Sequence, residues 1–440
     1  MKRVLLAGIA AAVLAVGCSS GSPDLATIVE EQGLEPFEAT IDADQALVAL
    51  GDALFWDPIL AGNKNMACST CHHTRFASGD GLSVSIGQGG TGIGTERIMD
   101  DAMLIPRNAT EVFNRGASEW TVQFWDGRVE GTPETGWSSS AGDQLPEGLD
   151  NVLAVQAMFP VASAGEMRGN PEDVEIFGVY NEIGELGDDD YTGIWAALTA
   201  RLIEIPEYVE MFADAYPEVA VGDLGFEHAA NALSAYQAKV FDFTDSPWNR
   251  YLGGDTAALS EDAKRGAVLF YGDATCATCH SGSLLSDQEF HSLAVPQIGP
   301  GKDEDAPEDF GRGRETHVDT DMYAFRTPSL HNVALSGPWT HDGAFSSLEA
   351  VIRHHMDPEA SLASYDVSQA IGPSLQYVNR DRYLDPLLAS VDPILEGIPD
   401  LSDEQVADLV AFLNALTDAA AMNLDHLVPE SVPSGLPVDR

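Results

Sequence analysis

Basic residues are scarce in this sequence of 440 residues. There are 22 Lys and Arg residues against 70 Asp and Glu, which gives a net charge of −48, and lysine occurs only five times. Nucleic acids and anionic membranes carry charge of the same sign, so neither is an expected partner. A basic protein would be attracted to this surface, and salt would weaken that attraction. The alternative is a solvated acidic coat suited to saline surroundings.

Near its start the chain has one apolar run, Val4–Val16, which follows Lys2 and Arg3. A charged segment followed by an apolar run too short to span a bilayer predicts a secretory signal. The run ends in Ala-Val-Gly-Cys18, which resembles a lipobox with Cys18 as the lipidated residue, so residues 1–18 are interpreted as a lipoprotein signal peptide. Ser19 rather than Asp follows, which favours an outer-membrane anchor facing the periplasm. The alternative is ordinary cleavage nearby, with loss of Cys18.

Cysteine is rare as well, with five residues in the chain. Apart from Cys18, the other four cysteines form two Cys-x-x-Cys-His motifs. These are Cys68-Ser-Thr-Cys71-His72 and Cys276-Ala-Thr-Cys279-His280. The pattern is typical of c-type haem attachment, in which both thiols form thioethers and the histidine becomes the proximal iron ligand. A structural zinc site or a redox dithiol is the alternative, although the dithiol motif has no trailing histidine. Bacterial haem attachment takes place outside the cytoplasm, which agrees with the export signal.

Few strand signals occur, so we expect a mainly α protein built from two cytochrome c-like haem domains that share an interface. Residues 19–45 are expected to be a polar tether, 46–245 the N-terminal haem domain and 246–430 the C-terminal haem domain. The pattern predicts helices over 196–212 with a break at Pro206, over 227–241, over 261–270 capped by Ser260, and after a capping box of Ser402 and Gln405. Loops are expected over 79–94, 131–150 and 297–321.

Four further blocks accompany the two motifs. They are residues 106–114, 123–128, 156–167 and 325–355. In this order the blocks and motifs resemble the bacterial dihaem cytochrome c peroxidase family, which includes MauG, from residue 50 to residue 415. The resemblance implies a catalytic haem on His72 and an electron-transfer haem on His280.

The resemblance also implies catalytic roles for Glu166 and Gln156. Glu166 matches the distal carboxylate that moves a proton between the peroxide oxygens, and Gln156 the amide that orients the peroxide. Trp125 matches the tryptophan between the haems, a plausible electron relay. Without this context, Glu166 would be read as a solvated surface group and Trp125 as a core residue.

A calcium site between the domains is implied in the same way. Asn108, Ser336 and Pro338 match its ligands, partly through backbone carbonyls, which calcium accepts readily. The family has Thr where this chain has Ser336.

Two positions depart from the common family pattern. Many family peroxidases have a histidine at Gln88 that ligates the catalytic iron at rest. An amide is a poor iron ligand, so this iron is expected to be open in the oxidised protein, unless His73 closes it. His355 falls at the sixth ligand of the electron-transfer haem, which is commonly Met in the peroxidases and Tyr in MauG. His354 and Met356 are adjacent alternatives.

Three functions follow from this reading. The first is a periplasmic peroxidase that reduces hydrogen peroxide with electrons from a small c-type cytochrome or cupredoxin. The second is a MauG-like enzyme that oxidises side chains of a partner protein. The third is a non-enzymatic dihaem electron-transfer lipoprotein. The family resemblance also allows a homodimer.

Overall fold

The computed structural model describes residues 24–38, 43–373, 375 and 383–440. The expected signal peptide, residues 1–18, and the lipidation site Cys18 lie outside the described residues. Within them, no helix is long and apolar enough to cross a membrane.

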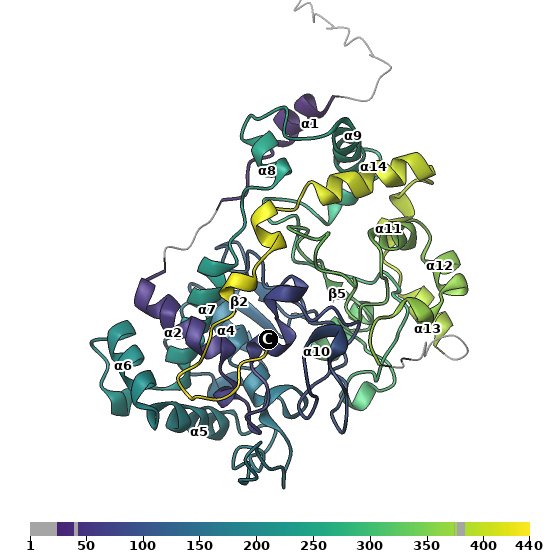
Figure 1. The fold of residues 1–440 in the computed structure, drawn as a ribbon. Coiled ribbons are helices and arrows are strands. Elements are labelled where there is room, and N and C mark those ends of the chain that lie inside the picture. Colours follow the sequence, from purple (N-terminus) through teal and green to yellow (C-terminus); the bar gives the residue numbers. More distant parts are fainter. Residues whose placement is uncertain (1–23, 39–42, 374, 376–382) are drawn as a thin grey trace, which may run out of the picture.

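The chain is mainly helical, as expected, and its helices gather into two groups (Figure 1). The helices of the first group are α2 (Gln45–Trp56), α4 (Val152–Ala157), α5 (Tyr191–Ile203), α6 (Pro206–Ala215) and α7 (Phe226–Val240). Helix α2 crosses α7 at close range. A Cβ atom on Gly51 would lie 1.9 Å from the carbonyl oxygen of Ala232, so only glycine permits this crossing. The core beside it is aromatic and includes Phe55, Trp56 and Phe241.

The second group repeats this arrangement. Its helices are α8 (Pro247–Leu252), α9 (Glu261–Tyr271), α10 (Arg312–Thr316), α11 (Leu348–Met356), α12 (Pro358–Ser364), α13 (Leu384–Ala389) and α14 (Asp403–Asn414). Helix α9 crosses α14 with Gly266 at the contact, where a Cβ atom would lie 1.9 Å from the carbonyl oxygen of Asp408. A separate core lies around Trp248, Phe270 and Phe412.

The described residues also form two small antiparallel sheets. One has the order β1 (Val122–Gln123), β2 (Val129–Thr132), β3 (Gly136–Ser139), and the other pairs β4 (Phe290–His291) with β5 (Phe325–Arg326). The expectation of a loop over 131–150 is therefore wrong for its first part, because Val129 to Thr132 pairs with Gly136 to Ser139 as a hairpin. Strand β1 is short and pairs with β2. Because Gln123 of β1 lines the first cavity described below, this pairing joins the hairpin to the cavity wall.

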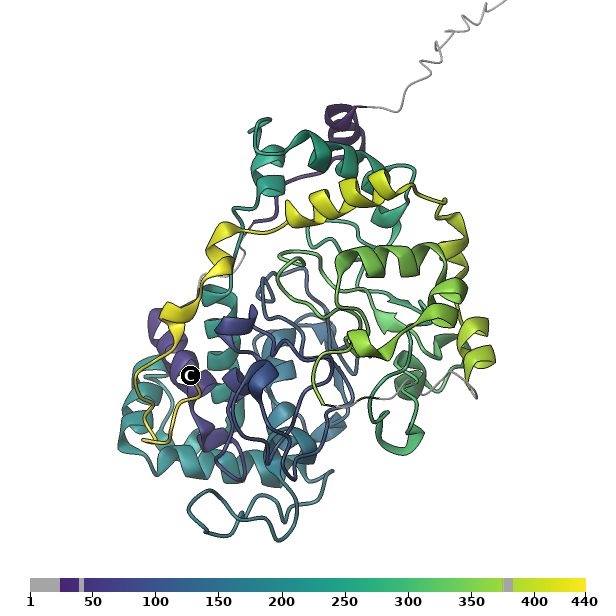
Figure 2. The same cartoon turned by 45° about the vertical axis from the view of Figure 1, so that its right-hand side comes forward.

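Both described ends of the chain cross from one half to the other. Helix α1 (Leu25–Gln32), inside the expected tether, packs with the second core. The tail that follows α14 returns to the first half (Figure 2), where the Ser434 hydroxyl donates to Asp57 and the Thr70 hydroxyl donates to Asp439 at 2.6 Å. The domain boundaries at 45/46, 245/246 and 430 stay predictions.

Candidate active site: two cavities with matching attachment motifs

Each Cys-x-x-Cys-His motif lines one cavity, and the two cavities have similar volumes of about 190 and 220 Å³. Cys68–Cys71 form the single-turn helix α3, and Cys276–Thr278 form a 3-10 turn, η8. In both motifs the histidine N–H donates to the carbonyl of the first cysteine at 3.0 Å. The same backbone turn therefore presents two sulfurs and one imidazole to each cavity.

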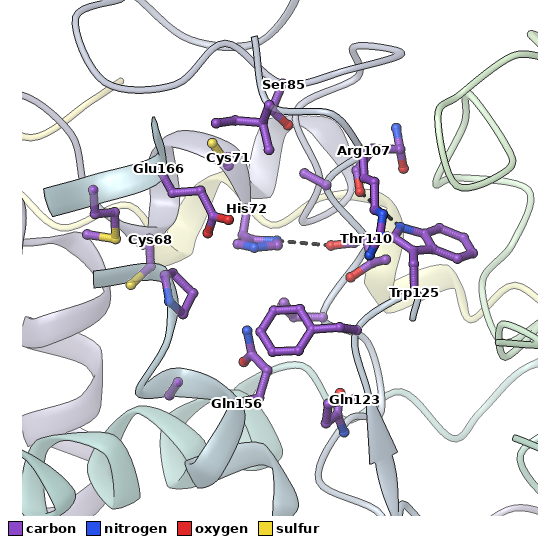
Figure 3. Close-up of a pocket in the computed structure, with 18 of the residues that line it drawn as sticks. Cys68, Cys71, His72, Ser85, Arg107, Thr110, Gln123, Trp125, Gln156 and Glu166 are labelled. Atoms are coloured by element: carbon purple, nitrogen blue, oxygen red, sulfur yellow. Dashed lines mark hydrogen bonds between the residues drawn. The ribbon is translucent and has the colours of Figure 1, made fainter. Parts of the chain in front are cut away.

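The motif histidines are oriented by backbone carbonyls. Nδ1 of His72 lies 2.9 Å from the carbonyl oxygen of Thr110 (dashed in Figure 3), and Nδ1 of His280 lies 3.1 Å from that of Leu285. A carbonyl can only accept, so Nδ1 carries the proton and Nε2 offers its lone pair. Burial lowers the pKa of both imidazoles, that of His280 to about 4. This neutral tautomer fits a proximal haem ligand.

The cysteine environment does not suit a redox dithiol. Burial raises the pKa of Cys68, Cys71 and Cys276 to about 12, whereas reactive dithiols need a lowered pKa. A shared zinc site is also disfavoured, because the two motifs line separate cavities. Residues of both motifs therefore fit thioether attachment of haem.

Glu166 and Gln156 meet at the first cavity. Figure 3 shows both side chains directed into the space in front of His72. Glu166 lies in a short π-helix, η6 (Ala164–Arg168), whose N-cap Ser163 accepts from its N–H at 3.4 Å, and Gln156 lies in the last turn of α4. Burial raises the pKa of the Glu166 carboxyl. The cavity is thus lined by a buried carboxyl group and by an amide.

Gln88 does not line this cavity. Its side-chain amide donates to the carbonyl of Met167 at 2.8 Å and accepts from the N–H of Gly169 at 3.0 Å. His73 is fully buried, and its Nδ1 accepts from the N–H of Arg75 at 3.1 Å. Among the described residues that line the first cavity, His72 is the single histidine.

His355 lines the second cavity together with His280. Its Nδ1 lies 2.9 Å from the carbonyl oxygen of Val351, so its Nε2 carries the free lone pair. His354 is fully buried, with its two ring nitrogens 2.9 Å from the Ser361 hydroxyl and 2.8 Å from the Leu293 carbonyl oxygen. These contacts argue against His354 as an iron ligand, while Met356 also reaches the second cavity.

Trp125 lies in the wall that the two cavities share, and its Nε1 donates to the carbonyl of Asn108 at 3.1 Å. Asn108, Ser336 and Pro338, the expected calcium ligands, all line the second cavity. The Asn108 amide donates from Nδ2 to the Leu82 carbonyl at 2.8 Å, which turns its side-chain oxygen the other way. The three expected ligands thus line the same cavity as Trp125, and calcium binding by them stays a prediction.

Sequence reasoning missed a buried charge network beside this wall. Arg107 donates to both carboxylate oxygens of Asp309, at 2.6 and 2.8 Å, and also to Asp126. Arg128 donates to Asp126 as well, and Lys302 reaches the first cavity. Asp126 and Arg128 stand in a recognised block, but nothing local in the sequence points to Asp309 or Lys302 as their neighbours.

A family model described as di-haem cytochrome c peroxidase matches residues 45–257. The methylamine utilization protein MauG of Methylorubrum extorquens is 28% identical over 384 residues, which cover 86% of this chain and 81% of the relative. The cytochrome c551 peroxidase of Pseudomonas aeruginosa is 29% identical over 303 residues, which cover 69% of each chain.

Solved structures agree with these relatives. The crystal structure of a MauG-like protein associated with microbial copper homeostasis has a TM-score of 0.61 and 26% identity, and covers 90% of this chain and 95% of that one. The diheme peroxidase BthA of Burkholderia thailandensis E264 has a TM-score of 0.57 at 20% identity over 92% of this chain and 93% of that one, which supports the fold alone.

Proposed function

Because the chain belongs to the di-haem cytochrome c peroxidase family, we propose that it reduces hydrogen peroxide to water with electrons from a small redox protein. Membership makes the chain an oxidoreductase and implies two haem c groups. The observation that carries the proposal is the meeting of Glu166 and Gln156 at the cavity in which His72 is the single lining histidine. An electron carrier has no need of this acid-amide pair.

Two electrons and two protons convert hydrogen peroxide into two molecules of water. Cys68, Cys71 and His72 would hold the first haem, which would supply the redox chemistry when bound. Glu166 takes a proton from one peroxide oxygen and returns it to the other, so that the second oxygen leaves as water. Gln156 orients the peroxide and donates a hydrogen bond to the oxygen on which charge develops. Because Gln88 is bonded to the backbone of Met167 and Gly169, the site is open in the oxidised protein.

With haem bound, His280 and His355 would hold the iron of the second haem, since both line the second cavity. Trp125 lies in the wall shared by the two cavities and would carry electrons between them. A small c-type cytochrome or cupredoxin is the donor. If it is basic, the charge of −48 attracts it to the surface.

Calcium and location complete the proposal. Asn108, Ser336 and Pro338 bind one calcium ion through oxygen atoms at the shared wall. The protein acts in the periplasm, held to the outer membrane by a lipid on Cys18, and a homodimer is its assembly. The negative charge leaves nucleic acid out of the set of partners.

The second candidate is a MauG-like oxidase of a partner protein. It is favoured by the similarity to MauG and by the absence of a histidine at Gln88. In that case Trp125 would pass oxidising equivalents outward to the partner. The third candidate, a dihaem electron-transfer lipoprotein, leaves Glu166 and Gln156 unexplained.

Steady-state turnover separates these functions. Hydrogen peroxide is mixed with the protein and an excess of a reduced small cytochrome c, and donor oxidation is followed with time. We expect two donor molecules oxidised per peroxide over many cycles. Haem spectra that respond to peroxide without donor consumption would favour the MauG-like oxidase, and no response of either kind would favour the electron carrier.

A further inference from the structure

Cationic side chains surround the first cavity, although the chain has few of them. Five of its 22 basic residues line this one cavity. They are Arg107, Arg115, Arg128, Lys302 and Arg326. We call this set the cationic wall. Lys302 and Arg326 come from the second half of the chain, so the wall is built by both halves.

Among the described residues, the five cations of the wall have four carboxylates as ion-pair partners, and the Glu166 carboxyl also lines the cavity. Arg107, Arg128 and Lys302 lie together, and the first two share Asp126, while Arg107 also binds Asp309. The partner of Lys302 is Asp303 at 3.2 Å, and the Asp303 side chain is 57% exposed. Burial, together with the nearby Arg128 and Arg107, lowers the pKa of Lys302. An anion on the cavity side stabilises a cation in such a place.

Arg115 gives a second, independent sign of a missing anion. Its side chain is 4% exposed, and one terminal nitrogen donates to Glu111 at 2.7 Å. The other terminal nitrogen is buried and has no partner within the described part of the chain. Buried guanidinium N–H groups are costly to leave unpaired, so a negatively charged acceptor is expected beside it.

The chemistry of haem attachment gives the position of that anion. The two cysteines bond to the vinyl substituents on one edge of the porphyrin, and the two carboxylates project from the opposite edge. In Figure 3, Cys68 and Cys71 lie on one side of the cavity, and Arg107 and Trp125 lie on the other. The carboxylates must therefore point toward the cationic wall.

We propose that Lys302, together with Arg128, binds a carboxylate of the first haem, so that a residue from the second half of the chain holds the cofactor of the first half. The Lys302 backbone is positioned for this, because its N–H donates to the Glu308 carbonyl at 2.9 Å and its carbonyl accepts from the Asp305 N–H at 3.0 Å. The cofactor then joins the two halves across their interface. This assignment rests on haem attachment at Cys68 and Cys71 and not on the reaction proposed above.

The test compares Lys302→Met, Lys302→Arg and Lys264→Met in the protein with both haems attached. Lys264 is the matched control, because it is a lysine of the second half whose contact is a surface pair with Glu261. The two readouts are the carboxylate bending bands in resonance Raman spectra and the reduction potential of each haem. Neither depends on turnover.

Removing a positive charge beside the carboxylate favours ferric iron. For Lys302→Met we expect the ferrous-to-ferric ratio of the first haem, at a fixed applied potential, to fall by about tenfold, equal to about 59 mV for one electron. Its carboxylate bands should shift while those of the second haem stay in place. In Lys302→Arg the ferrous-to-ferric ratio of the first haem should stay within a factor of two of the wild-type ratio (roughly 0.4 kcal/mol). In Lys264→Met this ratio should equal that of the wild type.

An unchanged potential and unchanged bands for the first haem in Lys302→Met would overturn the assignment, as would equal shifts in Lys264→Met. If Lys302→Met does not accumulate with both haems, Lys302→Gln receives the same two measurements, and an absence of shift there overturns it equally.

Discussion

The two cavities start from the same motif and differ on the face opposite it. In each, a histidine N–H bonds to the first cysteine's carbonyl and the imidazole Nδ1 bonds to a backbone carbonyl. The first cavity places Glu166 and Gln156 among charged side chains, whereas the second places His355 among aliphatic ones such as Leu348 and Val351. We therefore expect attachment to fix where each iron lies, and the other residues of each cavity to decide whether that iron meets substrate or passes electrons.

The largest effect on activity is expected from removing the carboxyl group of Glu166 in the first cavity. Glu166→Gln keeps the shape and removes the proton acceptor, so peroxide turnover should fall by about 10²- to 10⁴-fold. The spectra of both haems should stay close to those of the wild type. The control is Glu210→Gln on the exposed side of α6, which should retain full activity. Equal turnover in the two variants would remove Glu166 from the mechanism.

The second cavity can be opened to resemble the first. His355→Gly removes the imidazole opposite His280, so the low-spin haem should become high-spin, measured by electron paramagnetic resonance. His354→Gln is the matched comparison, since both His354 nitrogens already bond to protein and its loss should leave the low-spin signal. Persistence of the low-spin haem in His355→Gly would point to Met356.

His291 lines the second cavity, and its charge should make the stability of the protein depend on pH. The carboxylates of Asp287 and Asp392, which lie 3.1 and 2.6 Å from the two ring nitrogens of His291, raise the pKa of His291. A raised folded pKa means that the stabilisation is complete below the unfolded value of about 6.5 and declines as pH rises toward the folded value. Compared with the wild type, His291→Gln should lose about 2 kcal/mol at pH 6 and less at pH 9. Urea unfolding at both pH values measures this difference, and a loss that grows with pH would contradict it.

The smallest effect is expected at Gln88. Its variant tests whether this residue bonds only to the backbone or reaches the iron of the first haem. Gln88→Ala removes bonds to Met167 and Gly169, so the free energy of unfolding should fall by about 1 kcal/mol. The spin state of the first haem should not change, because the amide bonds to backbone rather than iron. Thermal unfolding and the optical spectrum check both parts, and a changed spin state would place Gln88 at the iron.

Local signals predicted the helices well and the charge network poorly. Ser260 caps α9, and Ser402 and Gln405 form the expected capping box of α14, because caps depend on residues three apart. The predicted break at Pro206 separates α5 from α6. The bond between Arg107 and Asp309 joins residues 202 positions apart, and no sequence periodicity encodes such a pairing.

Sequence alone also could not choose the sixth ligand of the second haem among His354, His355 and Met356. His354 and His355 are neighbours in sequence, but successive residues of a helix point about 100° apart, and of these two histidines His355 alone lines the second cavity. Spacing alone left both open with Met356. The structure separates them by their contacts, with His354 bonded at both nitrogens and His355 at one.

We expect the first iron to be open in the oxidised protein and the second to be closed by His355. The most direct test is to record electron paramagnetic resonance and optical spectra of the fully oxidised protein, before and after hydrogen peroxide is added without any reductant. We expect one high-spin and one low-spin ferric haem, with immediate reaction at the high-spin haem. Two low-spin haems that ignore peroxide until one electron is supplied would contradict it.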